Sequence, residues 1–189
     1  MHTAGVNVGY RGRFWSLGVT GYGGFFSLPF DGRSNVDFEG DRQWGASVDY
    51  SVNRRRMWFS GEVAMSQDKG VATTNTLLIR PLRELQFVLN YRYFSPRYHV
   101  FWGNTVSSLS GVNGEHGVSV AMEVPVGRAK KLSFLADVYK RLGVLDVRRA
   151  PGVGYELRGD FDGRLGDKVV LNSSLRYKER PGWYREEGW

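Results

Sequence analysis

Hydrophobic and polar residues alternate one by one along most of the chain. Val6, Val8 and Tyr10 alternate with polar residues or glycine, and the same period of two recurs at residues 44–52 and 132–138. This period indicates β-strands with two different faces, because successive side chains of a strand point to opposite sides. The pattern predicts ten strands, at residues 6–10, 17–25, 44–52, 59–65, 71–79, 85–91, 118–124, 132–138, 153–165 and 169–177. No window has a convincing helical period.

The connections between the predicted strands alternate in length. Short turns lie at residues 12–15, 53–56, 80–83, 126–131 and 163–168. The connections between them lie at residues 28–42, 94–115 and 140–152, with one short member at 67–70. Short turns at one end and longer loops at the other are typical of an outer-membrane barrel. Since the composition does not change sharply, we expect a single domain over residues 1–189, an all-β antiparallel up-and-down meander.

The alternation alone does not show whether the apolar face points into a soluble core or outward to lipid. Three features favour lipid. The strands approach the 9 to 11 residues that a tilted strand needs to cross a bilayer. Aromatic residues gather near strand ends, as they do at membrane interfaces, and the polar face mixes both charges with Ser, Asn and Gly. The sequence therefore predicts a transmembrane β-barrel or part of a larger one. A soluble antiparallel β-barrel binding module is the alternative.

Composition and charge narrow the choice of partners. The 26 Lys and Arg against 19 Asp and Glu give a net charge of +7, but the basic residues are dispersed or lie in short turn-like clusters. We therefore expect no nucleic-acid groove in this segment. The chain has no Cys and three His, so we expect no disulfide, metal site or cofactor. It has no run of about 18 apolar residues and no apolar signal-peptide core near its start.

The predicted topology also bears on the ends of the chain. If the short turns are periplasmic, both ends lie outside the cell, whereas bacterial barrels normally begin and end in the periplasm. Unpaired strand edges are also not viable in hydrocarbon. We therefore expect this chain to be part of a longer barrel, with outer-membrane lipid and further barrel strands or assembly partners around it. A closed ten-stranded barrel with unusual polarity is the alternative.

Seven charged residues share the parity of the polar face and are predicted to point into the lumen: Glu62, Arg92, Glu123, Asp137, Arg158, Asp160 and Arg176. Two roles are open. Such charges tune ion passage in wide barrels. They can equally pair across strands and fix the register.

The stretch YRYFSPRYHVFWGN, at residues 91–104, is the richest in aromatic residues. Ser95-Pro96 should end the strand, because proline has no amide hydrogen for the ladder. We expect the aromatics to lie at the outer rim, either anchoring the interface or folding inward over the mouth: Tyr93, Phe94, Tyr98, Phe101 and Trp102. Carbohydrate or ligand stacking is a further hypothesis. Nucleic-acid stacking would need a basic groove, for which Arg92 and Arg97 are weak support.

Catalytic chemistry has little support in the sequence. His99 and His116 lie in or beside one long loop, with several serines and Glu115 nearby, so a Ser-His-Glu arrangement is arithmetically allowed. There is no nucleophile elbow and no His-Glu metal motif. We therefore expect no enzymatic activity, and a loop hydrogen bond for His116.

Two stretches of the chain contain motifs that occur together in a known family. The first comprises YRYFSP at 91–96, then Tyr98, Phe101, GN at 103–104 and NGEHG at 113–117. The second comprises DVY at 137–139, then APG at 150–152, Gly154 and YE at 155–156. Both stretches resemble outer-membrane proteins of Bacteroidota that carry a helix-hairpin-helix region ahead of a β-barrel. The resemblance covers about residues 80–180, the barrel portion only, and KRLG at 140–143 departs from the family pattern.

This resemblance implies a place in the outer membrane of a Gram-negative bacterium. The implied function is a channel or a structural component of a transport or DNA-uptake assembly. No DNA-binding residue is carried over, because the helix-hairpin-helix region is absent. A ligand- or partner-binding surface on long extracellular loops is the alternative.

Overall fold

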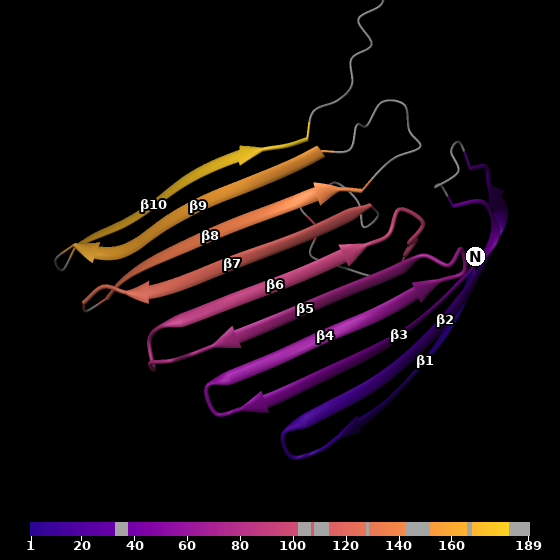
Figure 1. The fold of residues 1–189 in the computed structure, drawn as a ribbon, viewed down its shortest axis with the longest axis horizontal. Helices are drawn as coiled ribbons and strands as arrows, with labels where there is room; N and C mark the ends of the chain where they lie inside the picture. The colour runs from indigo at the N-terminus through magenta and orange to yellow at the C-terminus, as the bar shows by residue number, and fades with distance from the viewer. Residues whose placement is uncertain are drawn as a thin grey trace, which may run out of the picture.

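The protein forms one antiparallel β-sheet of ten strands (Figure 1). The computed structural model describes residues 1–32, 38–101, 107, 114–127, 129–142, 152–165 and 168–181. The strands are β1 His2–Arg11, β2 Trp15–Phe30, β3 Gly40–Arg54, β4 Met57–Ser66, β5 Val71–Ile79, β6 Gln86–Phe94, β7 Glu115–Pro125, β8 Lys130–Arg141, β9 Gly152–Leu165 and β10 Val169–Glu179. Each strand pairs with its neighbours in chain order. The predicted all-β up-and-down meander of ten strands is confirmed.

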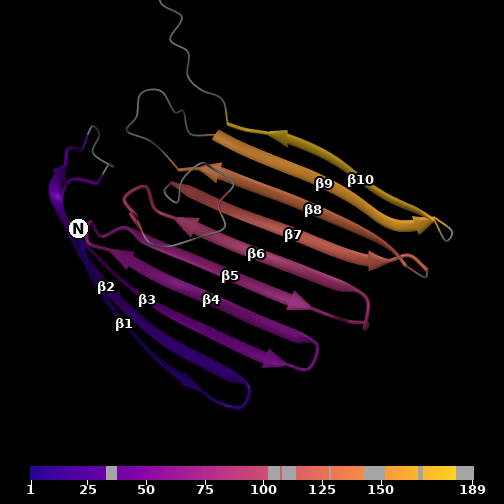
Figure 2. The ribbon, with the colours of Figure 1, turned by 180° about the vertical axis from the view of Figure 1, so that it is seen from behind.

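The alternation of short and long connections is also confirmed. The turns after β1, β3, β5, β7 and β9 are short and lie together at one end of the curved sheet, called here the short-turn end (Figures 1 and 2). The tightest joins β3 to β4, where Arg55 has a φ of 44°. The opposite end, the loop end, carries three longer connections and the short one between β4 and β5.

Two neighbouring rows of directly paired residues cross the sheet and define its two faces, because paired residues point to the same side. One row contains only polar residues: Arg11, Ser16, Ser51, Ser60, Thr76, Asn90, Ser119, Asp137, Glu156 and Lys178. The adjacent row contains only apolar or aromatic residues: Trp15, Val52, Phe59, Leu77, Leu89, Val120, Ala136, Leu157 and Tyr177. These rows define the polar face and the apolar face.

The strands are tilted relative to the short-turn end. The polar row starts at Arg11, the last residue of β1, and ends at Lys178, nine positions after Val169 at the start of β10. The register therefore shifts by about one residue per strand. Each residue rises about 3.4 Å along a strand, and neighbouring strands lie about 4.8 Å apart. A shift of one residue per strand therefore corresponds to a tilt of about 35°, which lies in the range of transmembrane barrels.

Burial is concentrated on the polar face. The buried hydrophobic residues are few: Phe38, Ala72, Phe94, Tyr98 and Tyr139. The buried polar residues are more numerous: Gln43, Ser66, Asn90, Arg92, Glu115, Asp137 and Glu156. On the apolar face, by contrast, Val8 is 68% exposed and Leu175 80% exposed. The sheet thus reverses the usual distribution of a soluble protein.

The two outermost strands have free edges within the described part of the chain. There, β1 pairs with β2 and β10 pairs with β9, and β1 and β10 do not pair with each other. The predicted closure into a barrel stays a prediction. No helix among the described residues is long and apolar enough to cross a membrane.

Candidate functional site on the polar face

Residues 95–101, called here the inward segment, leave β6 and fold back over the polar face. Ser95 starts the turn, since its carbonyl accepts the Tyr98 amide hydrogen bond at 3.0 Å and its hydroxyl accepts that of Val71 at 2.9 Å. Further along, Gln43 Nε2 donates to the His99 carbonyl at 2.8 Å. Gly70 permits this close approach, because a Cβ there would overlap the Arg97 carbonyl.

A small hydrophobic cluster fixes the first half of the inward segment. Phe94 and Tyr98 stack with ring centroids 6.5 Å apart, and both pack with Ala72. Ala64 and Val100 complete the cluster. The alanines of β4 and β5 leave room for the two rings, whose burial stabilises the fold by about 1.5–3 kcal/mol each.

A second cluster fixes the end of the segment. The Phe101 ring lies 5.3 Å from Phe26, 5.3 Å from Phe30 and 5.2 Å from Phe38. Such edge-to-face and tilted pairs add about 0.5–1.5 kcal/mol beyond their buried area. The inward segment is therefore held at both of its ends.

The predicted rim aromatics do not form one surface. Phe94, Tyr98 and Phe101 hold the inward segment. Tyr93 follows the opposite parity and lies on the apolar face beside His116, with ring centroids 6.0 Å apart. Trp102 lies outside the described residues.

A buried ion network joins β6, β7 and β8 beneath the polar surface. Arg92 Nη1 and Nη2 each donate to a different oxygen of Asp137 at 2.9 Å, and Arg92 Nε donates to Glu115. The three residues are 1%, 5% and 0% exposed, respectively. Ser107 Oγ donates to Glu115 at 2.6 Å. A Cβ at Gly117 would lie 2.7 Å from the guanidinium carbon, so a larger residue at this position would displace the Arg92 side chain.

Glu115 is the member of this network that the sequence analysis did not assign to the lumen set. It lies at the first position of β7, two residues before Gly117 and on the same face. Its parity was a usable signal. Its pairing with Arg92, however, depends on the register between β6 and β7, which a long connection separates.

The pairing register places all seven predicted lumen charges on the polar face. Six of them form ion pairs. Besides the buried network, Arg176 contacts Glu156 at 2.7 Å, Arg158 contacts Asp160 at 2.9 Å, and Lys131 contacts Glu123 at 3.4 Å. Lys178 also contacts Glu156, at 2.8 Å. Pairing across strands is therefore observed for these charges except Arg158 and Asp160, which both lie on β9. A role in ion passage stays a prediction.

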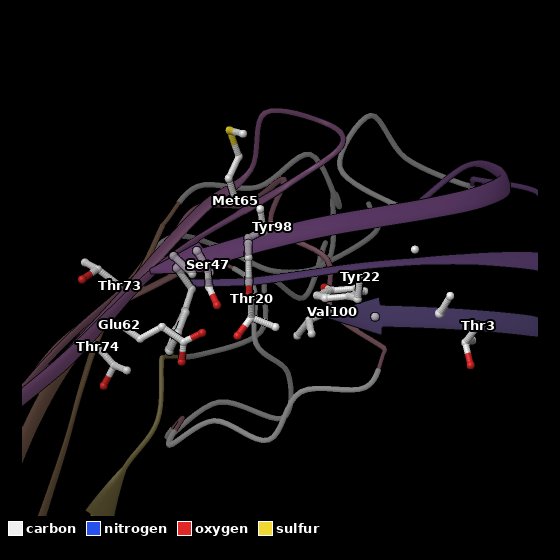
Figure 3. A pocket seen from close by; sticks show the side chains of 17 residues that line it. Thr3, Thr20, Tyr22, Ser47, Glu62, Met65, Thr73, Thr74, Tyr98 and Val100 are labelled. Carbon is white, nitrogen blue, oxygen red and sulfur yellow. The ribbon is translucent and has the colours of Figure 1, made fainter. Parts of the chain in front are cut away.

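Glu62 is the seventh of these charges, and no ion pair to it occurs among the described residues. It lines a cavity of about 480 Å³ between the polar face of β1 to β5 and the inward segment. Figure 3 shows Glu62, Ser47, Thr20 and Tyr98 gathered on one side of the strands, while Met65 points away from them.

The surroundings of Glu62 are rich in oxygen atoms. Asp49 is its direct cross-strand partner on β3, and both carboxylates line an adjoining hollow with several Ser and Thr residues. Tyr22 and Tyr98 line the main cavity. Burial, with smaller contributions from Tyr22 and Glu62, raises the pKa of Tyr98 to about 12, so its hydroxyl is neutral at physiological pH.

Known proteins give no assignment for this arrangement. No protein-family model, curated protein or solved structure matches the chain. The resemblance to Bacteroidota barrel proteins therefore stays an expectation from the sequence.

The candidate catalytic and metal-binding side chains do not converge within the described residues. Ser107 contacts Glu115 on the polar face, whereas His116 lies on the apolar face between Tyr91 and Tyr93. His116 therefore does not complete a Ser-His-Glu arrangement with these two residues. No group of three or more His, Cys, Asp or Glu side chains suited to a metal ion occurs in the described ranges.

Proposed function

We propose that this chain forms part of the wall of an outer-membrane β-barrel, whose polar face lines a water-filled passage narrowed by the inward segment. One observation carries the proposal: the apolar face is exposed, and the buried side chains on the other face are mainly polar or charged. A bilayer is the surrounding that favours this arrangement, since lipid covers outward apolar residues.

The geometry of the strands supports a membrane setting. They contain 9 to 16 residues, enough for a tilted strand to cross the hydrocarbon layer. The tilt of about 35° agrees with that of transmembrane barrels. A soluble sheet would leave this apolar face in water, at a cost of about 25 cal/mol for each Å² of apolar surface.

The free edges of β1 and β10 indicate which kind of partner the sheet requires in a membrane. Unpaired backbone groups in hydrocarbon each cost several kcal/mol, so in a membrane both edges have to pair, either with each other or with further strands. We propose that further barrel strands supply this pairing, with outer-membrane lipid around the apolar face. The resemblance to Bacteroidota proteins agrees with this location and connects the passage to a transport or DNA-uptake assembly.

Single-cysteine variants provide a direct test, because the natural chain contains no Cys. Ser60→Cys and Ser119→Cys sample the polar face, and their chain neighbours Phe59→Cys and Val120→Cys sample the apolar face. In outer membranes, fluorophores at 59 and 120 should be quenched by lipid-soluble quenchers. Cysteines at 60 and 119 should react with a water-soluble thiol reagent.

Two outcomes would contradict the proposal. One is recovery of the protein in the soluble fraction with no labelling difference between neighbours. The other is lipid quenching at 60 and 119 in place of 59 and 120. Ion conductance across a planar bilayer, measured on the same material, tests the passage separately from membrane insertion.

A further inference from the structure

We propose that the cavity between the polar face of β1 to β5 and the inward segment binds a small organic cation through its ammonium group, with Glu62 as the counter-ion. The binding site itself stands on the cavity. Its meaning as a selectivity site for transported cations rests on the proposed function.

The charge of the side chains that line the cavity is the first argument for a cation site. Among the described side chains that line the cavity, Glu62 is the only charged one, and it is exposed to any molecule that enters. The hydroxyl groups of Thr20, Ser47 and Thr74 add oxygen acceptors around it. A lining of this kind attracts a cation and offers an anion no basic partner.

The neighbouring charges strengthen this preference. Asp49 lies directly opposite Glu62, and like charges at such positions repel. A Cβ built at Gly18 would meet the Asp49 carboxylate, so this side chain lies against β2. Arg92, the buried basic residue among those described, is already held by Glu115 and Asp137. A cation bound in the cavity would lie beside Glu62, the member of this pair that lines it.

The apolar part of the lining indicates an organic cation. Tyr22, Phe94 and Tyr98 contribute rings, and Ala64, Ala72 and Val100 contribute aliphatic surface. Aromatic rings attract alkylammonium groups through their π-faces, and apolar walls suit methyl groups better than a hydrated metal ion. The volume of about 480 Å³ is within the usual range for small-molecule sites.

Choline and its neutral isostere 3,3-dimethylbutan-1-ol form a matched pair of probes, since they have similar shape and differ in charge. Binding to the purified full chain in detergent is measured by calorimetry and by ligand-observed NMR. We expect choline to bind at least about fivefold more tightly than the neutral alcohol. The expected difference is modest because a carboxylate and aromatic rings each contribute modestly to such a site. We expect Glu62→Gln to remove most of this difference, because it removes the negative charge that distinguishes choline from the neutral alcohol.

Two further variants keep the test independent of folding. Glu123→Gln changes a charge on the same face that is paired with Lys131 and distant from the cavity lining, and it should leave choline binding unchanged. Tyr98→Phe keeps the ring and should bind choline, whereas Tyr98→Leu should bind it less well. Far-UV circular dichroism checks that each variant retains its β-structure.

The outcomes separate this inference from the proposed function. If choline and its neutral isostere bind equally, or if Glu62→Gln and Glu123→Gln behave alike, the cation site is wrong even when the protein inserts and conducts. If Glu62-dependent choline binding occurs without membrane insertion, the site stands and the barrel proposal fails. If both hold, reversal potentials should favour choline over chloride and lose part of that preference in Glu62→Gln.

Discussion

The two halves of the polar face use charge in different ways. From β6 to β10, acids lie beside bases: Arg92 joins Glu115 and Asp137, and Glu156 receives both Arg176 and Lys178. From β2 to β5, Asp49 and Glu62 occupy directly paired positions among hydroxyl groups, and no described Lys, Arg or His forms an ion pair with either.

This difference distinguishes charges that are paired within the fold from charges that are accessible to a ligand. In the second half of the polar face, β6 to β10, a charge that is paired across strands fixes their register. Its counter-charge is already supplied by the protein. The two carboxylates in the first half, β2 to β5, are cross-strand neighbours of like charge and form no ion pair among the described residues. Residues that weaken local stability in this way concentrate at functional sites, which is why the first half is the better place for a ligand.

The largest effect should come from breaking the buried network. Arg92→Met removes the guanidinium that binds the buried carboxylates of Glu115 and Asp137, which should lower the free energy of unfolding by about 3–5 kcal/mol. Arg158→Met is the matched control, because Arg158 pairs with Asp160 and its side chain is 48% exposed. That change should cost less than about 1 kcal/mol. Urea unfolding in detergent micelles compares them, and equal losses would contradict the distinction.

A smaller loss is expected from filling the space beneath Arg92. Gly117→Ala places a methyl group 2.7 Å from the guanidinium carbon, so the side chain must move from its partners. Overpacking of this kind costs about 1–3 kcal/mol. Gly9→Ala is the control, since its Cβ would have one neighbour within 4 Å, the Leu17 carbonyl oxygen at 3.8 Å. A difference near zero between the two variants would show that the network tolerates displacement.

The strands and faces could be predicted from the sequence, whereas the contacts between distant segments could not. A period of two is a local property, so it locates all ten strands and puts the seven charges, from Glu62 to Arg176, on one face. The same parity separates Tyr93 from Phe94. The direction taken by the inward segment depends on Gln43 on β3, Ala72 on β5 and Gly70 in the turn between β4 and β5. No local pattern records such contacts, and the cavity depends on them.

Tyr98 belongs to the inward segment, which covers the half of the polar face that carries Asp49 and Glu62. It should make the free energy of unfolding depend on pH in the alkaline range. Its folded pKa of about 12 is above the ordinary value of 10.0, so the unfolded chain loses this proton first. The Tyr98 contribution is complete below pH 10 and is lost as the pH rises to 12, at about 1 kcal/mol per pH unit. The difference between the wild type and Tyr98→Phe isolates this proton from the other tyrosines. A pH-independent difference would contradict the assignment.

The smallest effect is a gain in stability. Glu62→Gln removes the repulsion between the two facing carboxylates and should raise the free energy of unfolding, without ligand, by about 0.2–1 kcal/mol. Asp49→Asn should do the same, and the double variant should gain less than the two single gains added together, because both relieve one interaction. Glu156→Gln is the matched control in the other half and should lose stability, since Arg176 and Lys178 lose their partner. If Glu62→Gln and Glu156→Gln both lower the free energy of unfolding, the carboxylates of the first half stabilise the fold like those of the second half. The argument that Glu62 is available to a bound cation would then fail.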